Sequence, residues 1–149
     1  MNRENVIKSL RFNFATSVFA AIIAIAAFET GYLTKGALAM SLGVEDIYYI
    51  EVSAIMLTMA IIPLAIKGFS RAMKKGANMD NYALLKLYSK KSLQRMFLLF
   101  IALVINIFIY YGVEYKGAMY CAILSFGALL YSYPTGKVLD EYTNNNETK

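Results

Sequence analysis

Histidine is absent from this sequence of 149 residues, and cysteine occurs once, at Cys121. Without histidine the chain lacks the most common general base and metal ligand. A single cysteine excludes an internal disulfide and any cysteine-based metal framework. The sequence also contains no glycine loop of the kind that cradles phosphates, and no paired acids at metal-binding spacing inside an apolar block. We therefore expect a protein that is not an enzyme and that holds no cofactor or metal.

Charged residues are also scarce, at 17% of the chain, whereas hydrophobic residues make up 58%. About twenty apolar residues in a helix suffice to cross the hydrocarbon core of a bilayer. The sequence predicts an all-α membrane protein with one domain, in which four transmembrane helices form two antiparallel hairpins. The predicted spans cover residues 12–33, 47–66, 96–112 and 117–133. A polar C-terminal tail follows at residues 134–149.

The basic residues are distributed unevenly around these spans. Only Lys35 and Lys116 lie in the loops after the first and third spans. All other basic residues lie near the two termini or between the second and third spans. Because basic loops stay in the cytoplasm, both termini are predicted to be cytoplasmic, in a cell inner or plasma membrane. Topology thus accounts for the net charge of +5, and no nucleic-acid-binding motif accompanies it.

The segment between the second and third spans, residues 67–95, is predicted to continue both helices into the cytoplasm. We call this segment the basic hairpin. Gly76 is a natural helix end, and Asp80 is a natural N-cap for the next helix. Each basic residue near a membrane surface contributes about 1 kcal/mol of attraction to anionic headgroups. We expect such headgroups, or a partner membrane protein, to bind the basic side chains of Lys67, Arg71, Lys74, Lys75, Lys86, Lys90, Lys91 and Arg95.

Small residues recur every three or four positions in the first and fourth spans. This spacing places them on one helix face, where a neighbouring helix can approach closely. In the first span they are Ser17, Ala20, Ala24, Ala27 and Gly31. In the fourth span they are Ala118, Cys121, Ser125, Ala128 and Ser132. The pattern predicts that both faces form helix contacts, with Cys121 as a packing residue.

A few polar residues interrupt the apolar blocks, and these form the candidate transport or polar site. They are Glu29, Glu51, Thr58, Asn106 and Tyr110. Glu51 shares a helix face with Thr58, so we expect it to turn toward another helix, where partial burial would disfavour its charged form. Glu29 lies close to a helix end, so we expect it to reach the outer interface. Asn106 is expected to bond to a neighbouring helix.

Two functions fit this pattern. The first is a transporter-like or channel-like protein that uses an intramembrane acid, with Glu51 preferred over Glu29. Matching positions of Pro63 and Pro134 in the two halves suggest an internal repeat of the kind found in some transporters. Four helices make a thin bundle, so permeation would require a homo-oligomer. The alternative is a non-catalytic accessory, assembly or immunity-type subunit that binds another membrane protein.

Overall fold

The computed structural model describes residues 3–76 and 79–136, and these residues form helices and loops without any strand. The predicted all-α fold is therefore confirmed for the described part of the chain. Most of the predicted polar tail, residues 137–149, lies outside it. The helices are α1 (Arg3–Glu29), α2 (Ala37–Ser41), α3 (Val44–Gly76), α4 (Asn81–Val113) and α5 (Lys116–Tyr131).

Helices α1, α3 and α4 are long and apolar enough to cross a membrane, and α5 is a shorter apolar helix. At a rise of about 1.5 Å per residue, the 33 residues of α3 and of α4 each extend for about 50 Å. This length exceeds the hydrocarbon core of a bilayer, which is about 30 Å thick. The helical continuation of the basic hairpin is therefore confirmed, while the number of spans and their sidedness stay predictions.

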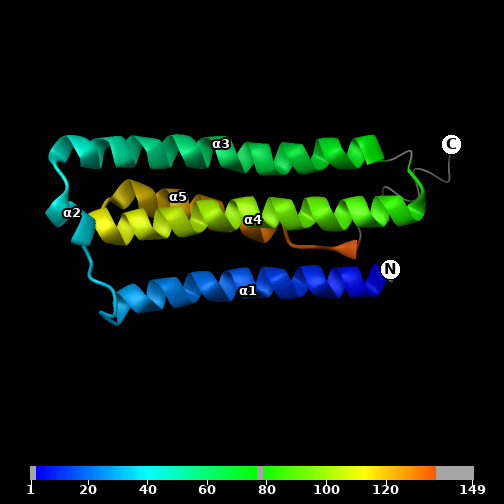
Figure 1. Ribbon diagram of the computed structural model, residues 1–149, viewed down its shortest axis with the longest axis horizontal. Helices are drawn as coiled ribbons and strands as arrows, with labels where there is room; N and C mark the ends of the chain where they lie inside the picture. Colours follow the sequence, from blue (N-terminus) through cyan, green and yellow to red (C-terminus); the bar gives the residue numbers. More distant parts are fainter. Residues whose placement is uncertain (1–2, 77–78, 137–149) are drawn as a thin grey trace.

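Helix α4 is the centre of the bundle (Figure 1). It lies between α3 and α1, and it also packs against α2 and α5. Half of its most apolar stretch is buried, compared with 11% for α1 and 17% for α3. The predicted neighbours α4 and α5 pack together, as do α3 and α4. Helix α1, however, has its main packing on α4 and not on α3, its expected hairpin partner.

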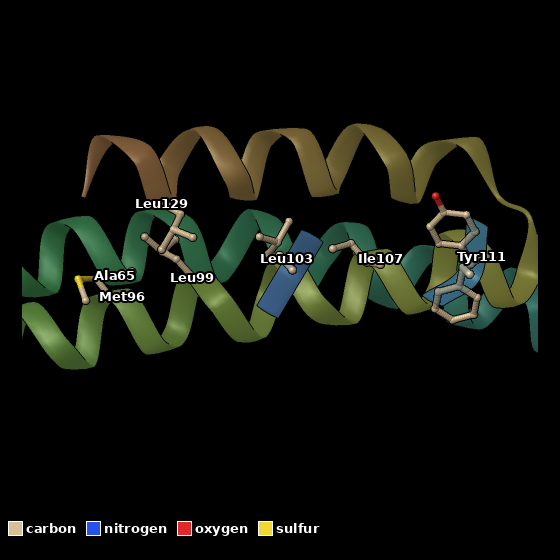
Figure 2. Packing of buried hydrophobic residues seen from close by; sticks show 9 residues of the cluster. Ala65, Met96, Leu99, Leu103, Ile107, Tyr111 and Leu129 are labelled. Carbon is tan, nitrogen blue, oxygen red and sulfur yellow. The ribbon is translucent and has the colours of Figure 1, made fainter. Parts of the chain in front are cut away.

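The larger apolar core forms where α4 faces α1, α3 and α5. Figure 2 shows Leu99, Leu103 and Ile107 of α4 in a row, with Leu129 of α5 beside Leu99. Close approach of α5 depends on its small residues, as predicted. The buried members of that face are Ala118, Cys121, Ser125 and Ser132.

A second core lies at the other end of the long helices, beside the turn between α3 and α4. We call it the hairpin-end core. It joins α1, α3 and α4 through the large side chains of Val6, Leu10, Phe69, Met73, Leu84, Leu85 and Tyr88. The rings of Phe69 and Tyr88 meet edge to face at 6.0 Å between centroids. At this end the first helix therefore contacts both α3 and α4.

The end of α1 differs from the prediction. The first helix was expected to continue to residue 33, with Gly31 on its small face, but α1 ends at Glu29. Gly31 has a φ of 79°, a left-handed conformation that ends helices and that glycine adopts without strain. Its neighbours close the turn, since the Leu33 N–H donates to the Ala27 carbonyl at 3.0 Å. Gly31 is therefore a helix terminator and not a packing residue.

The loop after α1 folds over the end of α4. The Gly36 N–H donates to the carbonyl of Tyr111 at 2.8 Å. The short helix α2 then places Leu38 directly against Gly112, where no larger side chain would fit without displacing the leucine. The sequence predicted this segment as a loop without any helix. The short helix α2 sets the distance between this loop and α4, because Leu38 contacts Gly112. We call this side of the molecule the α2 end.

Candidate functional site at the α2 end

Three side chains from separate segments meet at the α2 end. Glu29 is the last residue of α1, Lys35 lies in the following loop, and Tyr111 belongs to the last turn of α4. Lys35 Nζ lies 2.8 Å from Glu29 Oε2, and the Tyr111 hydroxyl donates to Glu29 Oε1 at 2.7 Å. The carboxylate therefore joins two segments that are 82 positions apart in the chain. We call these three residues the α2-end cluster.

Aromatic packing fixes the position of Tyr111 in this cluster. Its ring stacks on Phe28 at 4.7 Å between centroids and meets Tyr110 edge to face at 4.8 Å. Lys35 Nζ lies 5.4 Å from the centre of the Tyr111 ring, within the range of a cation–π contact. Tyr111 itself is 9% exposed, whereas the side chains of Lys35 and Glu29 are 42% and 55% exposed. The buried Tyr111 therefore presents its hydroxyl to Glu29 and the face of its ring to Lys35, and both charged side chains are accessible.

A groove of about 380 Å³ runs along the bundle from this cluster, between α1, α4 and α5. We call it the lateral groove. Its lining is aliphatic and aromatic, with Tyr110 and Tyr111 at the α2 end. Opposite walls come from Val18 and Ile22 of α1 and from Ala122 of α5. Because Tyr111 belongs both to the groove wall and to the α2-end cluster, the apolar space ends at polar side chains.

A separate polar contact lies inside the bundle, between α3 and α4. The Asn106 side-chain amide donates to Thr58 Oγ1 at 2.7 Å and to the Ala102 carbonyl at 2.8 Å. The Thr58 hydroxyl in turn donates to the Ala54 carbonyl at 2.8 Å. Asn106 Oδ1 is buried and has no donor among the described residues. The prediction that Asn106 bonds to a neighbouring helix is confirmed.

The five residues of the predicted polar site are thus divided between two places. Thr58 and Asn106 meet in the interior, while Glu29 and Tyr110 lie at the α2 end. Glu51 joins neither group: it is half-buried and has no hydrogen-bond or ion-pair partner among residues 3–76 and 79–136. Its predicted role as the functional acid stays a prediction.

Sequence analysis missed Lys35 and Tyr111 as partners of Glu29. The sequence places Lys35 only in the loop after the first span, and no pattern in it marks Tyr111 as a partner of Glu29. The available signal was the left-handed glycine at Gly31, which turns the chain back toward the helix end. A lysine placed six residues after a terminal glutamate then comes within reach of it.

Six of the eight basic side chains assigned to the predicted lipid-binding or partner-binding surface are exposed, and Lys91 is half-buried. Their binding of headgroups or of a partner stays a prediction. The Arg95 guanidinium instead lies 4.1 Å from the centre of the Phe69 ring and donates to the Ser132 carbonyl at 2.9 Å. Its planar group can stack and bond at the same time, which a lysine cannot do. Arg95 is therefore a structural contact as well as a charge.

This arginine contact holds the segment that follows α5. Figure 1 shows that residues 132–136 run between α4 and α1. The Tyr88 hydroxyl donates to the Thr135 carbonyl at 3.2 Å, and Arg3 donates to the Gly136 carbonyl at the same distance. Pro134 was predicted to end the fourth span, and α5 ends shortly before it, at Tyr131. The first residues beyond α5 are thus bound to the hairpin end.

Cys121 is a free, buried thiol that packs on the small-residue face of α5. In the described ranges, no three cysteine or acidic side chains are close enough to hold a metal ion. The α2-end cluster and the lateral groove together form the candidate functional site. Comparison of the chain with protein-family models, curated proteins and solved structures finds no match.

Proposed function

We propose that this protein is an integral membrane protein of transporter type, which accepts an amphipathic, lipid-like molecule from the bilayer through the lateral groove. One observation carries the proposal: Tyr111 lines the groove and its hydroxyl donates to Glu29. An apolar space that ends at an acid and a base matches a molecule with an apolar tail and a polar head. The intramembrane acid of the predicted transporter is then Glu29.

The two parts of the site have different tasks. Lipid tails are as apolar as the groove wall, so a tail that moves from lipid into the groove gains little free energy. Selection must therefore come from the polar head group. A hydrogen bond to a charged side chain contributes about 1.5–3 kcal/mol, so Glu29 and Lys35 are the residues that discriminate. The groove sets the length and width of the tail that fits.

Lateral uptake fits this chain better than a water-filled channel. Buried side chains of the larger apolar core and the Thr58–Asn106 contact join α3, α4 and α5 in the interior of the bundle. A water-filled pore would therefore need several copies around a common axis. A groove on the side of the bundle serves a single copy, so the proposal does not depend on a homo-oligomer.

The accessory-subunit alternative has one observation in its favour. Phe12 and Phe19 of α1 are 73% and 64% exposed, so this helix offers a broad apolar face that a transmembrane helix of another protein would cover. Mild-detergent purification separates the two functions. A foreign membrane protein that copurifies at a fixed stoichiometry favours the accessory role, while a homogeneous protein with bound lipid favours transport.

Filling the groove tests the proposal directly. The protein is reconstituted into vesicles that contain NBD-labelled phosphatidylglycerol or phosphatidylcholine, and dithionite quenching reports how fast label moves between leaflets. The native protein should accelerate this movement for one of the lipids. Ala122→Phe, which places a ring in the groove wall, should return the rate to that of empty vesicles. Ala26→Phe adds the same bulk on an exposed position of α1 and should leave the rate unchanged.

The two acids provide a matched pair in the same assay. Gln preserves the size and much of the hydrogen bonding of Glu but removes its charge. Glu29→Gln should lose the ion pair to Lys35 and slow the transfer, since Glu29 bonds to the groove residue Tyr111. Glu51→Gln should remain close to native, because Glu51 has no partner in the described ranges. The opposite result would return the functional role to Glu51 and contradict the proposed site.

A further inference from the structure

A second cavity lies on another side of the molecule, where the apolar part of α3 and α4 meets the basic hairpin. It has a volume of about 200 Å³ and lies between these two helices. One part of its wall is apolar and comes from Leu64, Ala65 and Leu98. The opposite part comes from Lys91, Gln94 and Arg95. We call it the interfacial pocket, since it shares no residue with the lateral groove.

The polar wall is built from one helix face. Gln94 and Arg95 lie three and four residues after Lys91, so their side chains lie one turn further along the helix, next to that of Lys91. Lys91 Nζ donates to Gln94 Oε1 at 3.0 Å, which holds both side chains along this face. Lys91 is the one lysine of the basic hairpin that is half-buried, while the others are exposed. Two cations thus line a partly enclosed space.

Arg95 is fixed in the pocket wall by two contacts. One of its terminal nitrogens donates to the Ser132 carbonyl, and its planar group stacks on Phe69. Its Nε atom is buried and has no acceptor among the described residues, so this atom does not face the open space of the pocket. The charge of the guanidinium nevertheless stays beside the pocket, because Arg95 is one of the lining residues. An anionic group in the pocket would be attracted by this charge.

Glycine at position 68 leaves room for the ligand. Gly68 lines the pocket from α3, and a Cβ built on it meets no atom within 4 Å. Neighbouring positions of α3 carry larger side chains, such as Leu64 and Phe69. A leucine at position 68 would therefore project into free space beside the cationic wall. The pocket owes its opening to this one residue.

We propose that the interfacial pocket binds the phosphate of an anionic phospholipid, with the start of an acyl chain along Leu64 and Leu98. The phosphate lies against the cationic side chains of Lys91 and Arg95, and the headgroup lies level with the first charged residues after the apolar run of α3. Basic pockets between membrane helices bind anionic headgroups in this way. The apolar wall favours a phospholipid over a soluble phosphate ester, which has no tail to contact it.

The experiment measures lipid binding to the full-length protein by native mass spectrometry after delipidation in a neutral detergent. The probes are dioleoylphosphatidylglycerol, dioleoylphosphatidylcholine and the soluble headgroup glycerol 1-phosphate. Phosphatidylglycerol should bind more tightly than phosphatidylcholine, and glycerol 1-phosphate should not compete with it. Equal binding of the two lipids would overturn the proposal. Effective competition by glycerol 1-phosphate would assign the pocket to a soluble phosphate instead and would also overturn it.

Two variants and a control locate the binding. Gly68→Leu should abolish the preference for phosphatidylglycerol without any change of charge. Lys91→Gln should weaken phosphatidylglycerol binding about fivefold, as expected for the loss of one basic side chain near an anionic headgroup. Lys90→Gln removes the same charge from the adjacent exposed position and should leave the preference in place. An equal loss in Lys90→Gln and Lys91→Gln, or an unchanged preference in Gly68→Leu, would show diffuse attraction and contradict a defined pocket.

Discussion

Helix α1 is held differently at its two ends. At the hairpin end, Val6 and Leu10 are enclosed by large side chains of both α3 and α4. Toward the α2 end, α1 packs mainly on α4, with Ala21 and Phe28 as its buried contacts. There it leaves the lateral groove open toward α5. The buried side chains of α1 thus meet both α3 and α4 at the hairpin end, whereas toward the α2 end the helix borders an open groove.

In the proposed membrane location, the difference would follow from the solvent around each end. Outside a membrane, apolar burial contributes about 25 cal/mol per Å², so helices that extend beyond the lipid are joined by large aliphatic and aromatic residues. Inside a membrane, lipid solvates an apolar helix as well as another helix does, and contacts rely on small residues and polar bonds. A loosely covered helix is therefore tolerated in the lipid-facing half. A groove can persist there because its apolar walls contact lipid, whereas the exposure of the same walls to water would cost free energy.

The largest expected effect concerns which side of the membrane each end faces. In a Cys121→Ser background, cysteine is introduced at Gly43, beside α2, or at Tyr82, near the basic hairpin; both positions are exposed. The distribution of basic residues predicts that Gly43 faces outward and Tyr82 faces the cytoplasm. An impermeant maleimide on intact cells should then label Gly43→Cys alone.

Permeabilised cells supply the control for this labelling, because both introduced cysteines should then react. Labelling of both positions in intact cells would place the two ends on one side. That result would show that the long helices do not cross the membrane, and the contrast between a lipid-solvated half and a water-solvated end would lose its basis.

The next largest effect is expected when a side chain of the hairpin-end core is truncated. Leu84 is 1% exposed, and Leu84→Ala should destabilise the fold by about 2–5 kcal/mol, the usual cost of truncating a buried leucine. Leu93→Ala removes the same atoms from a 46% exposed position of the same helix and should cost far less. Denaturant unfolding in detergent micelles measures both. Equal losses would mean that the hairpin-end core contributes no more to stability than an exposed position of the same helix.

The sequence was a good guide wherever one helix face or one helix length decides the outcome. The small residues Ala118, Cys121 and Ser125 are buried as their spacing predicts. The face of Ala54 and Thr58 on α3 also turns inward, as expected. The extension of two helices through residues 67–76 and 81–95 is confirmed as well. In each case the periodicity of a single helix carries the information.

Apart from the local ion pair of Lys35 with Glu29, the contacts that the sequence did not predict join distant segments. Hydrophobicity inside a membrane does not specify which helix packs on which, so the preference of α1 for α4 was not visible. The bond from Tyr111 to Glu29 depends on that packing. The contact of Arg95 with Ser132 likewise depends on where the chain leaves α5. Nothing in the sequence distinguishes Arg95 from the other basic residues of this segment, so its bond to a backbone carbonyl was not predicted.

The smallest expected effect concerns the polar contact in the lipid-facing half. Thr58→Val and Asn106→Leu each preserve approximate size and remove the bond between α3 and α4. Interhelical polar contacts in membranes contribute about 0.6 kcal/mol on average and up to about 1.7. A double-mutant cycle, measured by unfolding in detergent, should therefore yield a coupling of about 1 kcal/mol.

The reason for this modest value lies in the surrounding bonds. The Thr58 hydroxyl still donates to the Ala54 carbonyl when Asn106 is replaced, so it is not left unpaired. Replacement of Asn106 also removes Oδ1, a buried acceptor without a donor in the described ranges, which offsets part of the loss. A coupling as large as the Leu84→Ala loss would contradict this account. It would show that one buried polar contact holds the lipid-facing half as firmly as the apolar core holds the hairpin end.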